Sequence, residues 1–100
     1  MINDAVKASP ETHKLLFEND EIRVIEVTIK PGQKEPLHRH MYKSALLIHS
    51  PAKLRFTNQQ GNLIAEKIEQ GIIWRDPEEG HSVENIDQTP FRAYRFELKK

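Results

Sequence analysis

Apolar and polar positions alternate along most of the chain in short runs, which is the pattern of β-strands with one buried face. The two clearest runs are 22–30 and Phe91–Leu98, where β-branched and aromatic residues alternate with charged ones. The shorter runs each end near glycine, proline, asparagine or aspartate, and they are 12–18, 44–49, 53–57, 63–69, 72–75 and 81–85. Only residues 4–8 predict a short turn of helix.

Seven or eight short strands joined by tight turns predict an all-β protein, an antiparallel sandwich or barrel. A length of 100 residues fits one domain spanning 1–100, and the chain contains no internal repeat and no linker. Residues 1–10 precede the first strand, so we expect them to be either loose or paired with a partner.

Composition narrows the classes of partner. Lys+Arg and Asp+Glu are balanced at 15 each, which gives no electrostatic reason to expect a nucleic acid or an anionic membrane. No apolar run approaches the roughly 20 residues of a membrane span, and the N-terminus does not resemble a secretory signal. Cysteine is absent, which excludes thiolate ligands and fits a reducing compartment. We therefore expect a cytoplasmic protein.

Candidate chemistry begins in the stretch PLHRHMYKSALLIHS, residues 36–50. His38 and His40 are two residues apart, so in a strand their side chains point to the same face. Two imidazoles on one face can hold a metal ion, or they can be two polar residues at a strand end. A third histidine, His81, follows an E-E-G turn at the start of a later strand.

These stretches resemble the two sequence motifs of the cupin family. The first motif is a glycine, five residues and H-x-H, which this chain matches at Gly32, His38 and His40. The second is a glycine, five residues, P-x-G-x-x-H, three residues and an asparagine. The chain matches it, with one residue fewer between proline and histidine, at Gly71, Pro77, Gly80, His81 and Asn85. Together the two segments cover about half of the chain.

The resemblance implies a cupin-like jelly-roll (double-stranded β-helix) barrel of six to eight antiparallel strands. It also implies a divalent metal ion held by His38, His40 and His81. The family's glutamate ligand should fall at Ser44 or Ala45, and neither residue ligates a divalent metal well. Whether another residue replaces it is left open. Imidazole ligands suit Fe, Ni, Cu or Zn.

Three-histidine cupins include dioxygenases, so the resemblance implies metal-dependent dioxygenase chemistry on a small organic molecule. The rival interpretation is a non-enzymatic small-molecule-binding or sensor protein with a vacant or structural metal site. An isomerase or epimerase would need a proton-transfer pair. Tyr42 and Glu35 are the candidate catalytic residues. Tyr42 shares the strand parity of the histidines, whereas the odd parity of Glu35 argues against its entering the site unless Pro36 breaks the strand.

Residues outside the motifs receive structural interpretations. We interpret His13 and His49 as structural or surface residues, and Trp74 as an aromatic of the barrel wall. The resemblance also implies a homodimer, paired through sheet edges.

The last strand carries two sets of alternating residues. Aromatics fill an interior at lower cost than unpaired charges. We therefore expect Arg95 and Glu97 to face solvent or a partner, and Tyr94 and Phe96 to face the interior.

Overall fold

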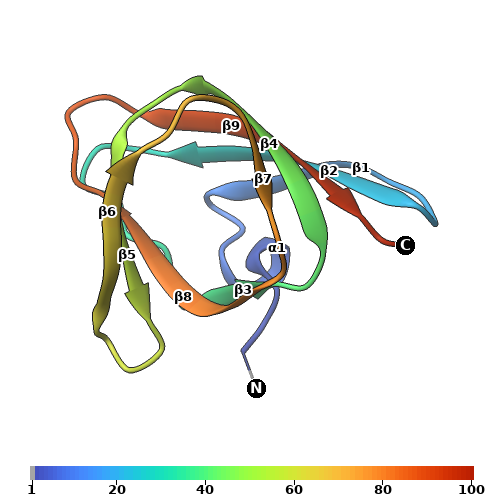
Figure 1. The fold of residues 1–100 in the computed structure, drawn as a ribbon, viewed down its shortest axis with the longest axis horizontal. Coiled ribbons are helices and arrows are strands. Elements are labelled where there is room, and N and C mark those ends of the chain that lie inside the picture. The colour runs from blue at the N-terminus through green and yellow to red at the C-terminus, as the bar shows by residue number, and fades with distance from the viewer. Residues whose placement is uncertain (1) are drawn as a thin grey trace.

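The computed structural model describes residues 2–100, which form two antiparallel sheets that face each other (Figure 1). The elements are α1 (Ala5–Ala8), β1 (His13–Glu18), β2 (Ile22–Ile29), β3 (His38–His40), β4 (Lys43–Ser50), β5 (Lys53–Asn58), β6 (Leu63–Ile68), β7 (Gly71–Arg75), β8 (Glu78–Asn85) and β9 (Phe91–Leu98). One sheet has the strand order β1-β2-β9-β4-β7 and the other β3-β8-β5-β6. The predicted all-β jelly roll is confirmed, although no ladder among the described strands closes the two sheets into a barrel.

The strands follow the predicted runs, with one addition and one correction. The addition is β3, a short strand that belongs to the other sheet from β4 although only two residues separate them. The correction concerns the E-E-G segment, which is the start of β8 and not a turn. Pairing with β3 explains this extension, because His40 lies opposite Glu78 and His38 opposite His81, with a bulge between the two pairs.

The apolar core lies between the two sheets, on the inward positions of the strands. Its buried members come mainly from β2, β4, β8 and β9, and they are Ile25, Val27, Ile29, Leu46, Ile48, Ala52, Leu54, Val83, Phe91 and Ala93. The alternation along β2 and β4 therefore points where the sequence pattern indicates.

The last strand, β9, contradicts the expectation for its charged residues. Arg95 is 4% exposed and Glu97 fully buried, whereas Phe96 is 40% exposed. The alternation was predicted correctly, but the inward and outward faces were exchanged. The reason is pairing: Glu97 binds Arg23 at 2.6 Å, and the Arg95 guanidinium lies 3.2 Å from Glu78, so neither charge is buried alone.

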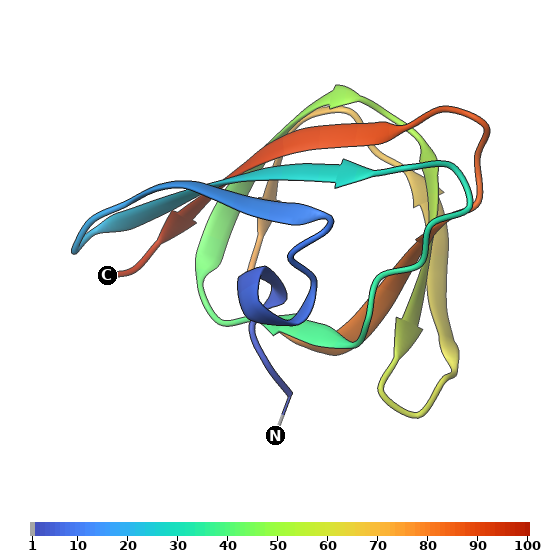
Figure 2. The same cartoon turned by 180° about the vertical axis from the view of Figure 1, so that it is seen from behind.

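The N-terminal segment packs against the body of the protein (Figure 2). Asp4 caps α1, and the carbonyl of Asn3 accepts a hydrogen bond of 2.9 Å from the amide of Arg39, next to the histidines of β3. Ala5 and Ser9 are buried. Within residues 2–100, no helix is both long and apolar enough to cross a membrane.

Candidate metal centre

Four histidines from three strands gather between the two sheets. His13 comes from β1, His38 and His40 from β3, and His81 from β8, and each is 6% exposed or less. The ring centroids of His38 and His40 are 5.1 Å apart, and those of His38 and His81 are 4.8 Å apart. The structure thus brings together the three histidines of the two motifs and adds a fourth.

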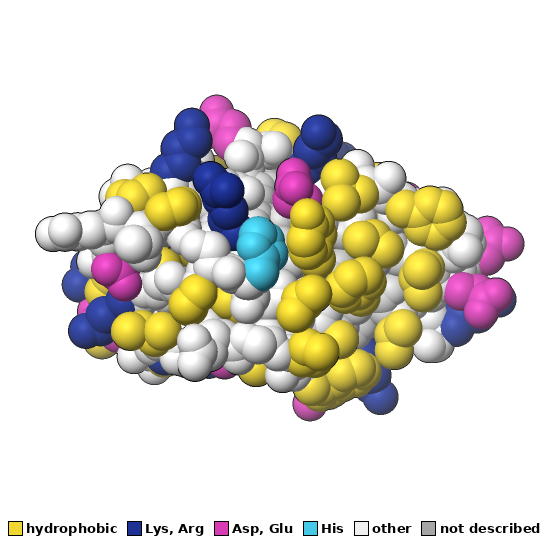
Figure 3. Space-filling view, turned by 90° about the horizontal axis from the view of Figure 1, so that it is seen from above, with side chains coloured by type: hydrophobic (Ala, Val, Ile, Leu, Met, Phe, Trp, Pro, Cys, Tyr) yellow, Lys and Arg dark blue, Asp and Glu magenta, His cyan; other side chains and the backbone are white. Residues whose placement is uncertain are grey.

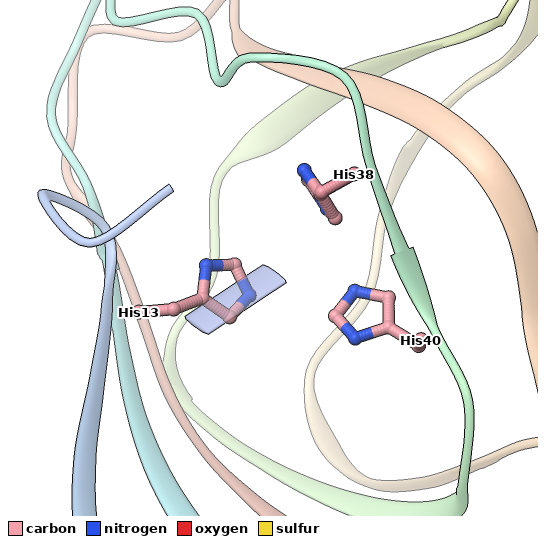
Figure 4. Close-up of side chains that lie close together, drawn as sticks. All are labelled: His13, His38 and His40. Atoms are coloured by element: carbon pink, nitrogen blue, oxygen red, sulfur yellow. The ribbon is translucent and has the colours of Figure 1, made fainter. Parts of the chain in front are cut away.

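His13 corrects the interpretation that it lies apart from the site. Its ring centroid is 5.4 Å from that of His38 and 5.5 Å from that of His40 (Figure 4). One ring nitrogen from each of these three residues lies within 4.8 Å of the others. No motif marks His13, because its place depends on how β1 sits opposite β3. His49 is exposed and stacks on Tyr94, as expected of a surface residue.

Two of the histidines are held in one orientation by hydrogen bonds at Nδ1. The Nδ1 of His38 lies 2.8 Å from the carbonyl oxygen of Pro36. A carbonyl can only accept, so this nitrogen carries the proton and Nε2 carries the lone pair. The Nδ1 of His13 likewise lies 2.9 Å from the Glu35 carboxylate.

The other two histidines also turn Nδ1 toward carboxylates, at longer distances. The Nδ1 of His81 is 3.4 Å from Glu78, and the Nδ1 of His40 is 3.7 Å from Glu97. Only His38 and His13 have Nδ1 within hydrogen-bond distance of an acceptor. The Nδ1 of His40 is buried and has no hydrogen-bond partner in the part of the chain that the structure describes. For His38 and His13 the arrangement is that of metal-binding histidines, in which an acceptor at one ring nitrogen orients the other toward the ion.

The remaining ring nitrogens are suited to a metal ion. The Nε2 atoms of His38 and His81 are buried and have no hydrogen-bond partner among the described residues. A buried polar atom without a partner costs about 1–3 kcal/mol, so a ligand at these two nitrogens would relieve that cost. Nitrogen donors fit Fe, Ni, Cu or Zn.

Burial also keeps these imidazoles in the form that binds metals. Removal from water lowers the pKa of His38 and takes the pKa of His81 to about 4. Burial, reinforced by the Arg95 guanidinium, places the pKa of His40 well below its ordinary value. The rings are neutral at pH 7, which leaves their lone pairs free to coordinate.

Glu35 enters the cluster, although strand parity argued against it. It precedes Pro36, and β3 begins only at His38, so strand alternation does not govern its direction. Its Oε1 is 3.9 Å from the Nε2 of His38, while its Oε2 accepts from the Thr12 hydroxyl. Burial acts to raise the pKa of Glu35, but the hydrogen bond and charge of His13 outweigh it and the pKa is lowered.

The position of the missing motif glutamate is now defined. Ser44 points inward and is fully buried, and its hydroxyl has no partner within residues 2–100, whereas Ala45 lies on the other face of β4. Glu97 lies directly opposite Ser44 in the β4–β9 ladder, and its carboxylate faces the Nδ1 of His40. Glu97 of β9, the strand next to β4, therefore places a carboxylate beside His40.

Arg95 completes the polar side of the site. Its guanidinium lies between Glu78 and Glu97, 3.2 Å from the first and 3.3 Å from the second. Burial lowers the pKa of Arg95 from its usual value, but a guanidinium remains charged at neutral pH. The sequence does contain a signal for their inward direction: strand alternation puts Arg95 and Glu97 on the same face of β9 as the buried Phe91 and Ala93.

Two further sequence candidates lie outside the cluster. Tyr42 is half-buried, and the Cζ atom of Arg23 lies over its ring, 5.3 Å from the ring centroid. Tyr42 does not line the cavity described below. Trp74 is 51% exposed on the outer face of the sheet and donates its Nε1 hydrogen to Asp76. The structure thus gives Trp74 an outward position.

The site opens onto two hollows. A cavity of about 50 Å³ lies between the sheets, with the histidines at one end and apolar core side chains such as Phe91 at the other. A larger hollow of about 370 Å³ lies beside it, lined by β5, β6 and the start of β8. Phe56, Arg75, Glu78 and His81 line both.

Comparisons with known proteins identify the fold. No protein-family model and no curated protein matches the chain. Among solved structures, a cupin domain from Bordetella pertussis Tohama I has a TM-score of 0.75 at 20% identity, over 100% of this chain and 99% of that one. An RmlC-like cupin protein with a double-stranded β-helix fold from Methanocaldococcus jannaschii scores 0.66 at 13% identity, over 87% and 78%.

A third structure, the polyketide cyclase RemF from Streptomyces resistomycificus, has a TM-score of 0.63 at 17% identity and covers 97% of this chain and 72% of its own. Similarity at these identities concerns the path of the chain and not its chemistry. The chain therefore has the cupin fold, an RmlC-like double-stranded β-helix.

Proposed function

We propose that the chain binds one divalent metal ion through His38, His40 and His81 and uses it to act on a small organic molecule. The observation that carries this proposal is the orientation of the imidazoles. The Nδ1 of His38 lies at hydrogen-bond distance from a carbonyl oxygen and that of His81 faces a carboxylate, and the Nε2 atoms of both are buried without a partner among residues 2–100. An ion at the centre of the cluster would satisfy these atoms.

A metal ion held by nitrogen ligands acts as a Lewis acid and keeps open positions for water, dioxygen or a chelating substrate. This chemistry favours a dioxygenase as the leading activity. The protein contributes an apolar wall, including Phe91, that limits access of water to the small inner cavity. The larger hollow, about 370 Å³, falls in the range of small-molecule sites and meets the cluster at His81.

The alternative is a non-enzymatic binding or sensor protein, and the state of the carboxylates favours it. Glu35 is engaged by Thr12 and His13, and Glu97 by Arg23. Carboxylates tied in this way are poor general bases, which also disfavours an isomerase. A polyketide cyclase has a similar fold, so ring closure is one of the outcomes that the experiment below distinguishes.

The experiment that separates these functions uses Fe²⁺-loaded protein and a panel of small metal-chelating organic compounds. Dioxygen consumption and compound binding are measured together, in the wild type and in His81→Gln. An oxygenase consumes dioxygen only with a bound compound, and His81→Gln abolishes the uptake. Binding without dioxygen uptake or product formation supports the sensor. A compound that is converted without dioxygen uptake supports a cyclase or isomerase.

A further inference from the structure

We propose that His13 is a fourth ligand of the metal ion and replaces the carboxylate that the cupin motif places at position 44. The inference rests on the proposed metal site and adds a residue that lies outside both motifs. Its first support is position, because one ring nitrogen each of His13, His38 and His40 lies within 4.8 Å of the others. Figure 4 shows His13 facing the two β3 histidines from the opposite strand.

The second support is the way in which His13 is held. Its Nδ1 lies 2.9 Å from Glu35 and 3.0 Å from the hydroxyl of Thr12. The hydroxyl of Ser9 donates to the same Glu35 oxygen at 3.4 Å, so three polar side chains of one buried cluster determine the ring orientation. When the ring is neutral and Nδ1 donates to the carboxylate, the lone pair is on Nε2, where a metal ion can take it.

The third support concerns Glu35, which is the competing candidate for the fourth position. Its Oε2 already accepts from Thr12, Ser9 and His13. A carboxylate that accepts from the Nδ1 of a ligand raises the basicity of that imidazole and fixes its orientation. Through Oε2, Glu35 therefore acts as a positioning residue, while its Oε1 lies 3.9 Å from the Nε2 of His38. Ser44 supplies no carboxylate from β4, so the fourth ligand has to come from another strand.

The test compares wild type and His13→Asn, using Cu²⁺ for spectroscopy and Zn²⁺ for affinity. The asparagine amide can still donate to Glu35, but it removes Nε2. Pulsed electron paramagnetic resonance counts the imidazoles on bound Cu²⁺, and chelator competition gives the dissociation constant for Zn²⁺. We expect one imidazole fewer and an affinity loss greater than the roughly 10–100-fold that follows loss of a supporting residue. His49→Asn, at an exposed histidine, is the matched control.

Two further variants complete the design. Glu35→Gln should weaken Zn²⁺ binding without changing the imidazole count, as expected for a positioning residue. Adding Ser44→Glu to His13→Asn should restore much of the affinity, because it returns the carboxylate to its motif position.

The possible failures are distinguishable. An unchanged imidazole count and affinity in His13→Asn overturn the role of His13 while leaving the three-histidine site intact. The role of His13 is also overturned if the imidazole count falls in Glu35→Gln but stays unchanged in His13→Asn. The lost imidazole would then belong to another histidine. Wild type that takes up neither Cu²⁺ nor Zn²⁺ refutes the metal site itself.

A separate observation supports a second proposal, about the outer face of the five-stranded sheet. One row of outward-facing residues crosses all five strands of this sheet and is entirely apolar. Each residue of the row pairs with its neighbour on the adjacent strand. The row runs Phe17, Val24, Phe96, Ala45 and Trp74. Figure 3 shows hydrophobic side chains gathered over much of this side of the molecule.

We propose that this face binds a second copy of the chain, so that the expected homodimer pairs through a sheet face and not through sheet edges. Six of its large side chains are more than one third exposed, and they are Phe17, Leu47, Ile72, Trp74, Phe96 and Leu98. At roughly 100 Å² each they present about 600 Å², which approaches the roughly 800 Å² that each partner contributes to a standard interface. The chain has a formal net charge of zero, so two copies do not repel each other. A continuous apolar row is also self-complementary, as a two-fold interface requires.

Sedimentation equilibrium between about 5 and 200 μM tests this proposal. The wild type should have twice the mass of the chain, and Ile72→Lys with Trp74→Lys should have the mass of one chain. Leu63→Lys, on the other sheet and 61% exposed, is the control and should remain a dimer. A wild type that stays monomeric throughout this range overturns the proposal, as does a double variant that still dimerises. A monomer that instead binds lipid vesicles points to a membrane occupant and also overturns it.

Discussion

At the end of β9 that lies near the histidines, the two faces of the five-stranded sheet differ in the opposite sense from most globular proteins. The inner face buries Arg95 and Glu97 there, while the outer face of the same strand exposes Phe96. The inner charges are stable because they are paired, and their pairs lie beside the candidate metal centre. The outer apolar row is exposed at Phe17, Phe96 and Trp74, as a proposed interface would be. Strand alternation alone shows that two faces differ, but it does not show which one is buried.

The largest expected effect comes from breaking the inner charge pairs. Glu97→Leu leaves Arg23 with Asp4 alone and Arg95 with Glu78 alone as anionic partners. Because Glu97 is the fully buried member of both pairs, its loss should cost up to about 3–5 kcal/mol of the free energy of unfolding. Urea denaturation measures this loss. Glu66→Leu, which removes the partner of the exposed Arg55, is the control and should change the midpoint only slightly.

If Glu97→Leu were as mild as that control, the inner network would contribute little to stability. A further arm adds Arg95→Leu to Glu97→Leu. It should recover part of the loss, because it removes one of the two buried cations that lost Glu97 as a partner.

A smaller effect should appear with pH in metal-free protein. The pKa of His81 is lowered by burial from 6.5 to about 4, so between these values the unfolded chain binds a proton that the folded chain does not. Stability is therefore unaffected above pH 6.5 and falls as the pH drops toward 4, by at most about 3 kcal/mol for this residue. Thermal melts from pH 8 to pH 4 would detect the fall. A flat profile would contradict the burial of neutral imidazoles.

Zn²⁺ provides an internal check on this pH profile. Bound metal requires the imidazoles to be neutral and so strengthens the folded state at pH 7, where the ligands are already deprotonated. Acidification then removes both the metal and its stabilisation. We expect the melting temperature of Zn²⁺-loaded protein to fall more steeply with acid than that of metal-free protein.

The smallest effect concerns the outer face. Ile72 is 77% exposed, so Ile72→Thr should change the intrinsic free energy of unfolding by less than about 0.5 kcal/mol. In a dimer, however, the melting temperature rises with protein concentration. Melts at two concentrations should show this dependence in the wild type and a weaker one in Ile72→Thr. Equal dependence in both would place Ile72 outside any interface.

Sequence analysis predicted the fold well because the fold depends on local signals. Strand positions followed from alternation and from turn residues, and the last strand was predicted with the bounds that the structure has. The histidines of β3 lie on one face because residues two apart must do so in a strand. Their approach to His81 could be expected only from the motif resemblance, since it depends on the β3–β8 ladder.

The remainder of the site could not be predicted because it depends on packing between distant segments. His13 reaches the cluster through the position of β1, and Glu35 through the path of the chain before β3. Neither carries a periodic signal. The direction of Arg95 and Glu97 was mispredicted because their ion-pair partners, Arg23 and Glu78, lie far away in the sequence.

The most direct test of the account is the metal content of untagged protein, measured by elemental analysis beside His40→Ala. His49→Ala, at an exposed histidine outside the cluster, serves as the control. We predict about one equivalent of Fe, Ni, Cu or Zn in the wild type and in the control, and a large loss in His40→Ala. Wild-type protein that contains no metal and takes up none when Fe²⁺ or Zn²⁺ is added would contradict the central claim.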